Sequence, residues 1–468
     1  MKPNNRFTVS TVHCLSRRQR LVIGFVFLVI MVAGTHDLTY STHYDSIMAM
    51  SSSQLAYKIE AGSITRQIAF VALLIGGVLV MVGARNDGPY SSALRNNVPL
   101  ACFIGFAFLS ILWSSDPELT FKRSTEFLIF CIGAAAAGRI LGLRGVVWLG
   151  FLGSTGYLLI GLIAEMVLGT FRPLSVDYRF CGTLHPNHQA WNCILLLISG
   201  SALLAQIRRS WRAAYFMAMM LAVICLVLTK SRTSLACGAL ALTFYWAGRT
   251  SLKQKLTIVL SGALLTSVLL VTTLFTSDGT SQLNQMLLAG RDVDTYQNFS
   301  GRIPLWRVCM KYVGMRPGMG YGYDGFWTAG HIRDISAEEG WTVPIAHNGY
   351  IELMLSLGVI GLILYMYQLG GAWRVLRRSY RATHDPFVRF YLALLIYYWT
   401  CMFAEAIGFD VGLPTFCLLS MLWSRKLWFQ RQLTLIPTTT VIQGLSPRKP
   451  INDDHLALGK NIITPEPA

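Results

Sequence analysis

The residues best suited to chemistry lie at the start of the stretch VPIAHNGYIELMLSLGVIGLILY, residues 343–365. His347 and Asn348 come directly before a long apolar run, and Glu352 follows within it. A neutral imidazole can take a proton from a hydroxyl group, which is the task of a general base. The positive end of a helix dipole disfavours an imidazolium ion, so a histidine at a helix start should stay neutral. His347 is therefore the candidate base, and the alternative is a capping or interfacial histidine.

Two polar neighbours of His347 have expected supporting roles. Asn348 is expected to cap the helix that the apolar run predicts. Glu352 lies four residues later on the same face, and an acid inside an apolar span is a candidate functional residue by default. The alternative is that Glu352 only orients a neighbour. Gly358 and Gly361, further along the same run, are expected to permit close helix packing.

Three arginines form a second group of candidates. Arg179 lies in DYRFCGTLHPNHQA, Arg232 in TKSRTS and Arg302 in FSGRIPLW, all in segments expected on the outer side of a membrane. Basic residues are disfavoured in short outer connections, so the first two run against the trend. Guanidinium groups suit bidentate binding of phosphate. Together the arginines predict a site for a membrane-bound diphosphate, and the alternative is an ordinary interfacial arginine paired with an acid.

Two patterns could instead hold a metal ion. His185 and His188 are three residues apart, as metal ligands on one helix can be, but Pro186 at a helix start explains the segment adequately. Asp292 and Asp294 form a D-x-D pattern, which we interpret as a solvated acidic turn. Neither pattern is therefore interpreted as a metal site, and no cofactor is predicted.

The composition predicts the elements that must position these residues. The chain is 53% hydrophobic and only 13% charged, with mean hydropathy +0.47, whereas soluble proteins are about 25% charged. Roughly 20 apolar residues span a membrane, and about twelve such runs occur. We therefore predict an all-α, polytopic membrane protein with one large periplasmic loop that carries short helices. The runs start near Leu21, Gln67, Val98, Thr125, Val146, Gln189, Ala213, Thr233, Leu256, Gly349, Phe387 and Val411.

Basic residues set the expected orientation. With the N-terminus in the cytoplasm, the inner segments carry SRRQR, RRSWR, RTSLKQK, RVLRRSYR and SRKLWFQR, and most of the 40 Lys and Arg residues. The net charge of +17 is then mostly a cytoplasmic girdle facing anionic lipids, and it requires no nucleic acid partner. The first run, LVIGFVFLVIMVAG, lacks a convincing cleavage site and is expected to remain as the first span.

The predicted organisation has five parts. Residues 1–20 are a cytoplasmic segment, 21–275 hold spans one to nine, and 276–345 form a periplasmic loop that folds as a cap. Residues 346–431 hold spans ten to twelve, and 432–468 form a cytoplasmic tail expected to be disordered. The ten cysteines lie mostly in apolar runs without a C-x-x-C pair, so they indicate packing rather than disulfides or zinc.

The predicted cap, 276–345, is too long to be a simple connection. It holds many aromatic residues and a glycine-dense run, GMRPGMGYGYDGFW. The segment RIPLWRVCMKYV has helical spacing, with Ile303, Trp306 and Met310 on one face. Aromatic density suits sugar stacking, and it suits an interfacial aromatic belt equally well.

Four motifs in order, RFCGTLHPN, SRTSL, SGRIPLW…PGMGYGYDGF and AHNGYIELMLSLGVIG, resemble those of a known family. The family is the O-antigen ligase/polymerase family of bacterial envelope glycosyltransferases. In it an H-N segment opens the span after a large periplasmic loop, and G-R-x-x-x-W lies within that loop. The resemblance covers roughly residues 120–425, and each motif is short.

The resemblance implies an inverting, metal-independent glycosyltransferase of the bacterial inner membrane, with its active site facing the periplasm. The donor would be an oligosaccharide on undecaprenyl diphosphate. The implied base is His347, and the implied diphosphate-binding residues are Arg179, Arg232 and Arg302. Candidate supporting residues are His185, Asn187, Asn348 and Glu352.

Three functions stay open. A polymerase would transfer the glycan to another lipid-linked repeat of an exopolysaccharide, capsule or O-antigen, and a ligase would transfer it to lipid A core or to a protein. The third is a polysaccharide flippase or transporter, although no internal repeat is visible. We favour a polymerase, because the loop is modest in size and no added periplasmic domain would receive a large acceptor. Expected partners include membrane lipids and a chain-length regulator or flippase.

Overall fold

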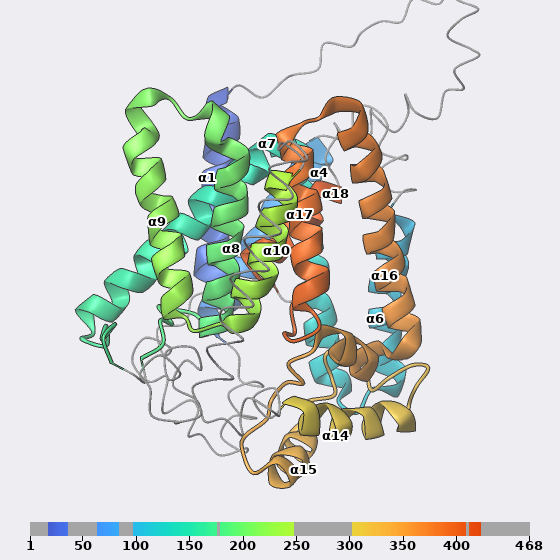
Figure 1. Ribbon diagram of the computed structural model, residues 1–468. Helices are drawn as coiled ribbons and strands as arrows, with labels where there is room; N and C mark the ends of the chain where they lie inside the picture. Colours follow the sequence, from blue (N-terminus) through green and yellow to red (C-terminus); the bar gives the residue numbers. More distant parts are fainter. Residues whose placement is uncertain are drawn as a thin grey trace, which may run out of the picture.

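The computed structural model of the chain describes residues 17–35, 63–83, 97–175, 178–247, 302–408 and 411–422. Every regular element in these segments is a helix (Figure 1). The predicted all-α class is therefore confirmed for the described part of the chain. The helices are α1 (Arg17–Thr35), α4 (Ile64–Gly83), α6 (Val98–Leu109), η1 (Ser110–Trp113), α7 (Pro117–Val167), α8 (Pro186–Leu203), η2 (Leu204–Gln206), η3 (Arg209–Trp211), α9 (Arg212–Leu228), α10 (Arg232–Ala247), α14 (Arg302–Met315), α15 (Ala329–Glu339), α16 (Gly349–Thr383), α17 (Pro386–Cys401) and α18 (Leu413–Leu422).

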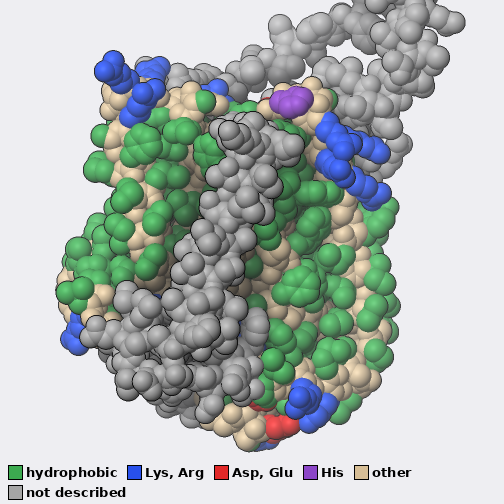
Figure 2. Space-filling view, viewed as in Figure 1, with side chains coloured by type: hydrophobic (Ala, Val, Ile, Leu, Met, Phe, Trp, Pro, Cys, Tyr) green, Lys and Arg blue, Asp and Glu red, His purple; other side chains and the backbone are tan. Residues whose placement is uncertain are grey.

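Five of the described helical stretches are long and apolar enough to cross a membrane. Figure 2 shows hydrophobic side chains over the middle of one face, with groups of Lys and Arg toward the end opposite α14 and α15. The protein is therefore a multi-pass membrane protein. The predicted count of about twelve spans is not confirmed, and the run near Leu256 lies outside the described residues. The five stretches are Ile64–Val82, Pro117–Val167, Pro186–Gln206, Arg209–Leu228 and Gly349–Thr383.

The long helix α7 contains two of the predicted runs, those near Thr125 and Val146. Its regular geometry is interrupted at Gly142, where φ is 63° and ψ is −178°. A residue with a side chain rarely adopts this backbone conformation, so glycine permits the break. Close packing accompanies it, because a Cβ atom added to Gly138 would lie 1.8 Å from the carbonyl oxygen of Ser420 in α18.

Helices α8 and α17 form the centre of the bundle (Figure 1). Almost every residue of α8 is buried, and α17 is buried over most of its surface. A helix that is apolar on all sides belongs in the interior of a membrane protein. The ends of these two helices are consequently fixed by packing, and they lead into the segments that carry the polar site.

The described part of the predicted cap begins at Arg302, and residues 276–301 lie outside the described residues. Helix α14 confirms the helical spacing of RIPLWRVCMKYV. Its buried face, however, is formed by Leu305, Val308 and Cys309, while Ile303 and Met310 are 41% and 45% exposed. Together α14, α15 and the aromatic residues between them enclose a second hydrophobic core, which also includes Ile351 and Leu355 of α16.

The glycine-dense run of the cap docks onto a break in α16. Gly358 has φ 64° and ψ −167°, so the helix is interrupted there. The carbonyl of Leu355 accepts a hydrogen bond from the amide of Tyr321, at 2.8 Å, and that of Ser356 accepts one from Gly322, at 2.9 Å. A Cβ atom at Gly358 would lie 2.2 Å from the carbonyl oxygen of Gly318. Gly358 therefore admits the backbone of the cap, where a contact between helices was expected.

Candidate active site

Hydrogen bonds join the start of α16 to the segment after α17. The Asn348 side chain caps α16 by accepting hydrogen bonds from the amides of Tyr350 and Ile351, as the sequence predicts. Its own amide group donates to the carbonyl of Phe403, at 2.9 Å. The amide of Gly349 donates to the carbonyls of Met402 and Glu405. These bonds join two segments that are distant in sequence, and they fix the backbone on either side of the site.

His347 immediately precedes this cap. It has a left-handed backbone conformation, with φ 51°, which non-glycine residues seldom adopt. Such strain persists where the surroundings enforce it, and it often marks functional positions. The side chain is 21% exposed, and its ring stacks near that of Trp341, with the ring centres 6.3 Å apart.

The imidazole of His347 is neutral at physiological pH. Burial, with smaller contributions from the charges of Arg302 and His188, lowers the pKa of His347 from its ordinary value to about 3. The sequence predicts this neutral state from the helix dipole, whereas the main cause in the structure is removal from water. Burial also lowers the pKa of His185 well below its ordinary value.

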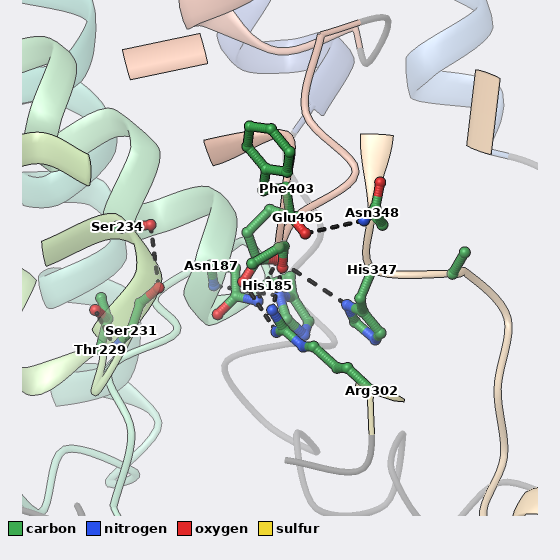
Figure 3. A network of polar contacts seen from close by, with 12 residues as sticks. His185, Asn187, Thr229, Ser231, Ser234, Arg302, His347, Asn348, Phe403 and Glu405 are labelled. Carbon is green, nitrogen blue, oxygen red and sulfur yellow. Dashed lines mark hydrogen bonds and ion pairs between the residues drawn. The ribbon is translucent and has the colours of Figure 1, made fainter. Parts of the chain in front are cut away.

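The carboxylate of Glu405 is the centre of the polar network (Figure 3). One oxygen, Oε1, lies 3.0 Å from the Arg302 guanidinium, and the other, Oε2, accepts a hydrogen bond of 2.8 Å from the Asn187 amide. Oε2 also lies 4.0 Å from Nδ1 of His347. Burial raises the pKa of Glu405, and the nearby Arg302, Asn187 and Arg179 oppose that shift. A single carboxylate thus connects residues from three separate segments.

Two of the three predicted arginines lie in this network. Arg302, at the first turn of α14, also donates to the carbonyl of Ala404. Arg179 donates to the carbonyl of Thr229, at 3.0 Å, and to the side-chain oxygen of Asn187, at 3.2 Å. Two guanidinium charges therefore meet one carboxylate, Glu405. This excess of positive charge favours an anionic ligand.

The loop that carries Arg179 is held by a buried acid of α7. The Glu165 carboxylate accepts hydrogen bonds from the amides of Cys181 and Gly182, at 2.9 and 2.6 Å, and from the hydroxyl of Tyr178. Gly182 has φ 58°, and a Cβ atom there would lie 2.7 Å from the Cα atom of Gly161. The loop therefore packs closely against α7, and this contact restricts the position of the Arg179 backbone.

Arg232 is the first residue of α10 and is half-buried. It belongs to the tight connection between α9 and α10 whose Thr229 carbonyl accepts the hydrogen bond from Arg179. The neighbouring Ser231 hydroxyl donates to that of Ser234, at 3.0 Å (Figure 3). The structure therefore places Arg232 in the same hairpin that anchors Arg179.

His185 and Asn187 stand at the start of α8. His185 is its N-cap, with Pro186 in the first turn as predicted, and Nδ1 of His185 accepts a hydrogen bond from the amide of Asn187. The rings of His185 and His188 are 5.8 Å apart. Within the described segments there is no group of three or more His, Cys, Asp or Glu residues suited to a metal ion. Asp292 and Asp294 lie outside those segments.

Glu352 is buried and bonded inside the protein. One carboxylate oxygen accepts a hydrogen bond from the indole of Trp327, at 2.9 Å, and the other accepts one from the amide of Ala346. Ala346 directly precedes His347. Glu352 therefore ties the cap to the backbone that holds the candidate base, which agrees with the alternative of an orienting residue.

The sequence interpretation missed Glu405 as a candidate. A signal for it was present, because Glu405 is an acid at the end of an apolar run, in YYWTCMFAEAIGF. An acid within an apolar span is a candidate functional residue, and this criterion, which selected Glu352, also applies to Glu405. The rings of His188 and Trp191 lie beside this site with their centres 4.3 Å apart and their planes tilted by 31°; His188 was considered only as a metal ligand, and Trp191 was not considered.

The site combines a neutral imidazole, a buried carboxylate and two guanidinium groups at one end of a membrane bundle. Such a set of groups can activate a hydroxyl group beside a bound anion. Comparisons with known proteins agree with this chemistry. A family model described as O-antigen ligase matches residues 193–366, a range that includes Arg232, Arg302 and His347.

A second comparison extends the similarity along the chain. "Exopolysaccharide production protein ExoQ" of Rhizobium meliloti (strain 1021) is 25% identical over 356 residues, which cover 72% of this chain and 78% of that protein. The two matches confirm the resemblance that the motifs predict. The chain is therefore similar to membrane proteins of the O-antigen ligase/polymerase type, and the two matches support an envelope-glycan function of this type.

Proposed function

We propose that the protein is an envelope glycan polymerase. It transfers a glycan from an undecaprenyl-diphosphate carrier to a hydroxyl group of a second lipid-linked repeat, at the periplasmic face of the bacterial inner membrane. The observation that carries this proposal is the position of neutral His347 beside a buried cluster that contains Arg179 and Arg302. The acceptor needs a base, and the lipid diphosphate leaving group needs positive charge.

The reaction follows from these roles. The acceptor oxygen attacks the anomeric carbon of the donor sugar as the bond from that carbon to the diphosphate oxygen breaks, which inverts the configuration. His347 takes the hydroxyl proton. The bonding electrons leave with undecaprenyl diphosphate, whose developing negative charge Arg179 and Arg302 stabilise. Fixed cations aimed at a leaving group supply stabilisation that grows in the transition state.

The bound donor itself tunes the base. A pKa of about 3 makes His347 a weak proton acceptor while the site is empty. The charge of Arg302 contributes to that low pKa, and a diphosphate bound at Arg302 offsets this charge. Donor binding therefore offsets the smaller, electrostatic cause of the low pKa of His347, while the larger cause, burial, remains. Glu405, whose Oε2 lies 4.0 Å from Nδ1, stabilises the imidazolium ion by its charge after the imidazole has taken the proton.

The polymerase is preferred to the ligase on one specific observation. The related protein named above is described as an exopolysaccharide production protein, and a free polysaccharide is built by joining lipid-linked repeats. A ligase that transfers the glycan to lipid A core or to a protein is the second candidate, supported by the family model described as O-antigen ligase. Glycan transfer without a metal ion is part of the proposal.

A reconstituted reaction tests the function. We expect the purified protein, supplied only with the lipid-linked repeat and a chelator, to produce carrier-linked glycans two or more repeats long. Gel separation of the labelled products measures their length. Elongation only after addition of lipid A core or an acceptor protein would favour the ligase. Transport of the lipid-linked repeat across the bilayer of a vesicle, without any elongation, would contradict both enzymes.

Exposed residues at the two ends of the bundle test the orientation. We expect a cysteine at Glu338, in α15, to react with a membrane-impermeant maleimide in cells whose outer membrane is permeabilised. A cysteine at Arg378, near the end of α16, should react only after lysis, because the basic end of a membrane protein faces the cytoplasm. Both native side chains are exposed, and the unsubstituted protein provides the background. The reverse labelling pattern would refute a periplasmic site.

A further inference from the structure

A cavity of about 810 Å³ lies among α1, α4, α7, α8 and the segment before α18. Its volume is within the usual range of sites for small ligands, about 300–1,000 Å³. Neither Arg179 nor Arg302 lines this cavity, and the proposed reaction gives it no role. The lining residues that matter here are Arg66, Arg123, Glu126, Trp191, Asn192 and Asp324.

Trp191 and Asn192 of α8 line this cavity, and each carries a buried polar atom without a hydrogen-bond partner among the described residues. The two atoms are the indole nitrogen of Trp191 and the side-chain oxygen of Asn192. Each of these residues is only 3% exposed. A buried polar atom without a partner is costly and calls for an explanation. Neither atom exposes surface to the cavity in the present side-chain rotamers, so each side chain must turn to reach a ligand there. A ligand that then accepts from Trp191 and donates to Asn192 would supply the missing partners.

The charges that line the cavity balance one another. Glu126 lies 3.3 Å from Arg66 and 3.2 Å from Arg123, and Arg123 also lies 3.4 Å from Asp324. Two cations thus meet two acids, in contrast to the arginine excess around Glu405. Such a cavity does not favour a diphosphate. Carboxylate, guanidinium, amide and indole groups together suit sugar hydroxyls, which both donate and accept hydrogen bonds.

His188 connects the cavity to the candidate active site. It lines the cavity, its ring lies against that of Trp191 at a tilt, and it lies beside His185 at the start of α8. It also contributes to the lowered pKa of His347. His188 therefore lines the cavity and also lies within electrostatic range of the proposed base. Because the donor diphosphate is assigned to the arginine cluster, the second substrate needs a site of its own.

We propose that this cavity binds the glycan of the acceptor repeat through Trp191, Asn192 and the ion pairs of Arg66 and Arg123. The inference rests on the proposed polymerase function, and the part of the substrate that enters the cavity is the acceptor glycan. The acceptor sugar approaches His347 past His188. The bound hydroxyl groups complete the hydrogen bonding of the two unpartnered atoms of α8.

Binding measurements with two separate probes test this site. One probe is the oligosaccharide repeat released by mild acid from the lipid carrier of the host, and the other is undecaprenyl diphosphate without sugar. The protein is held in lipid nanodiscs, with the variants Asn192→Leu and Trp191→Phe. The matched control is Trp399→Phe, because the indole nitrogen of Trp399 also lacks a partner among the described residues but does not line the cavity.

We expect Asn192→Leu and Trp191→Phe each to weaken oligosaccharide binding about 2- to 12-fold, the worth of one neutral hydrogen bond. Binding of undecaprenyl diphosphate should stay unchanged in both, and Trp399→Phe should bind both probes normally. The melting temperature of Asn192→Leu should not fall, because leucine has a similar volume and leaves no polar atom unpaired. A purely structural role would instead lower the melting temperature and leave oligosaccharide binding unchanged, which would overturn the inference.

The two probes separate this inference from the proposed function. If the wild-type protein binds undecaprenyl diphosphate but not the oligosaccharide, the acceptor site is wrong while the function stands. If it binds neither probe, the proposed function fails, and this inference fails with it.

Discussion

Replacing His347 by alanine is expected to lower the rate of glycan transfer about 10²- to 10⁴-fold, the usual contribution of general acid–base catalysis. The protein should remain folded, because the side chain lies at the mouth of the site and is 21% exposed. Lipid-linked repeat should accumulate in cells, and long glycan should disappear. The measurement uses purified enzyme with lipid-linked donor and a chelator.

The control for this substitution must respect the left-handed backbone of His347, φ 51°. Asparagine tolerates that conformation better than most residues, so His347→Asn keeps the backbone but cannot take the proton. Both variants should be equally inactive. Activity of His347→Ala within about threefold of wild type would show that the histidine serves the fold. The base would then have to be sought elsewhere, first at Glu405, which lies 4.0 Å from the imidazole, rather than at Glu352, whose oxygens are bonded to Trp327 and Ala346.

The pH profile of the wild-type enzyme tests the same assignment. A base acts only while it is unprotonated, so activity is lost as the pH falls through its pKa. The kcat/KM value reports the free enzyme, in which the pKa of His347 is about 3, so it should show no loss due to His347 between pH 8 and 5. If bound diphosphate offsets the charge of Arg302, kcat should decline at a higher pH than kcat/KM does. Identical profiles for the two parameters would contradict tuning by the donor.

Replacing Arg302 by lysine is expected to lower transfer about 10- to 150-fold, although the positive charge is kept. A lysine is a single point donor and cannot reproduce the planar fork of a guanidinium. The loss of one charge-assisted hydrogen bond is worth roughly 1.5–3 kcal/mol, which converts to this range of rates. In the structure the guanidinium of Arg302 donates hydrogen bonds to both Ala404 and Glu405. Arg179→Lys and Arg232→Lys should have similar effects.

A matched variant on the same cap is Arg316→Lys. Arg316 donates to the carbonyl of Trp113 and lies over the ring of Tyr321, away from the candidate active site. The Arg316→Lys variant should transfer glycan at nearly the wild-type rate. Initial rates are compared at equal amounts of membrane-inserted protein. If all three variants, at Arg179, Arg232 and Arg302, retained near-normal transfer, the diphosphate-binding hypothesis would be rejected.

The sequence predicted the parts of this protein whose signals are local. His347 and Asn348 were visible because two polar residues open an apolar run, and Asn348 does cap α16. The helical spacing after Arg302 predicted α14. Arg179 and Arg302 could be grouped only through the motifs and the expected orientation, since no local pattern relates them.

The central role of Glu405 could not be predicted, because it arises from distant contacts. Its partner Asn187 is 218 residues away in the chain, and Arg302 is 103 residues away. Hydrophobic periodicity describes one helix at a time, so it cannot show which helix ends meet. The break at Gly358 was missed for a related reason. A glycine in an apolar run signals close approach, but whether a helix or a loop approaches depends on the fold.

The junction at Gly358 has a consequence for chimeric proteins. The amides of Tyr321 and Gly322 complete the hydrogen bonding of carbonyls in an interrupted membrane helix, so the glycine-rich run serves as part of that helix's own scaffold. A cap exchanged between relatives at its two sequence ends would arrive without the matching interruption. The unit that can be transplanted therefore consists of the run around 317–327 together with the turn of α16 around 355–359, and recombination boundaries should be drawn outside both.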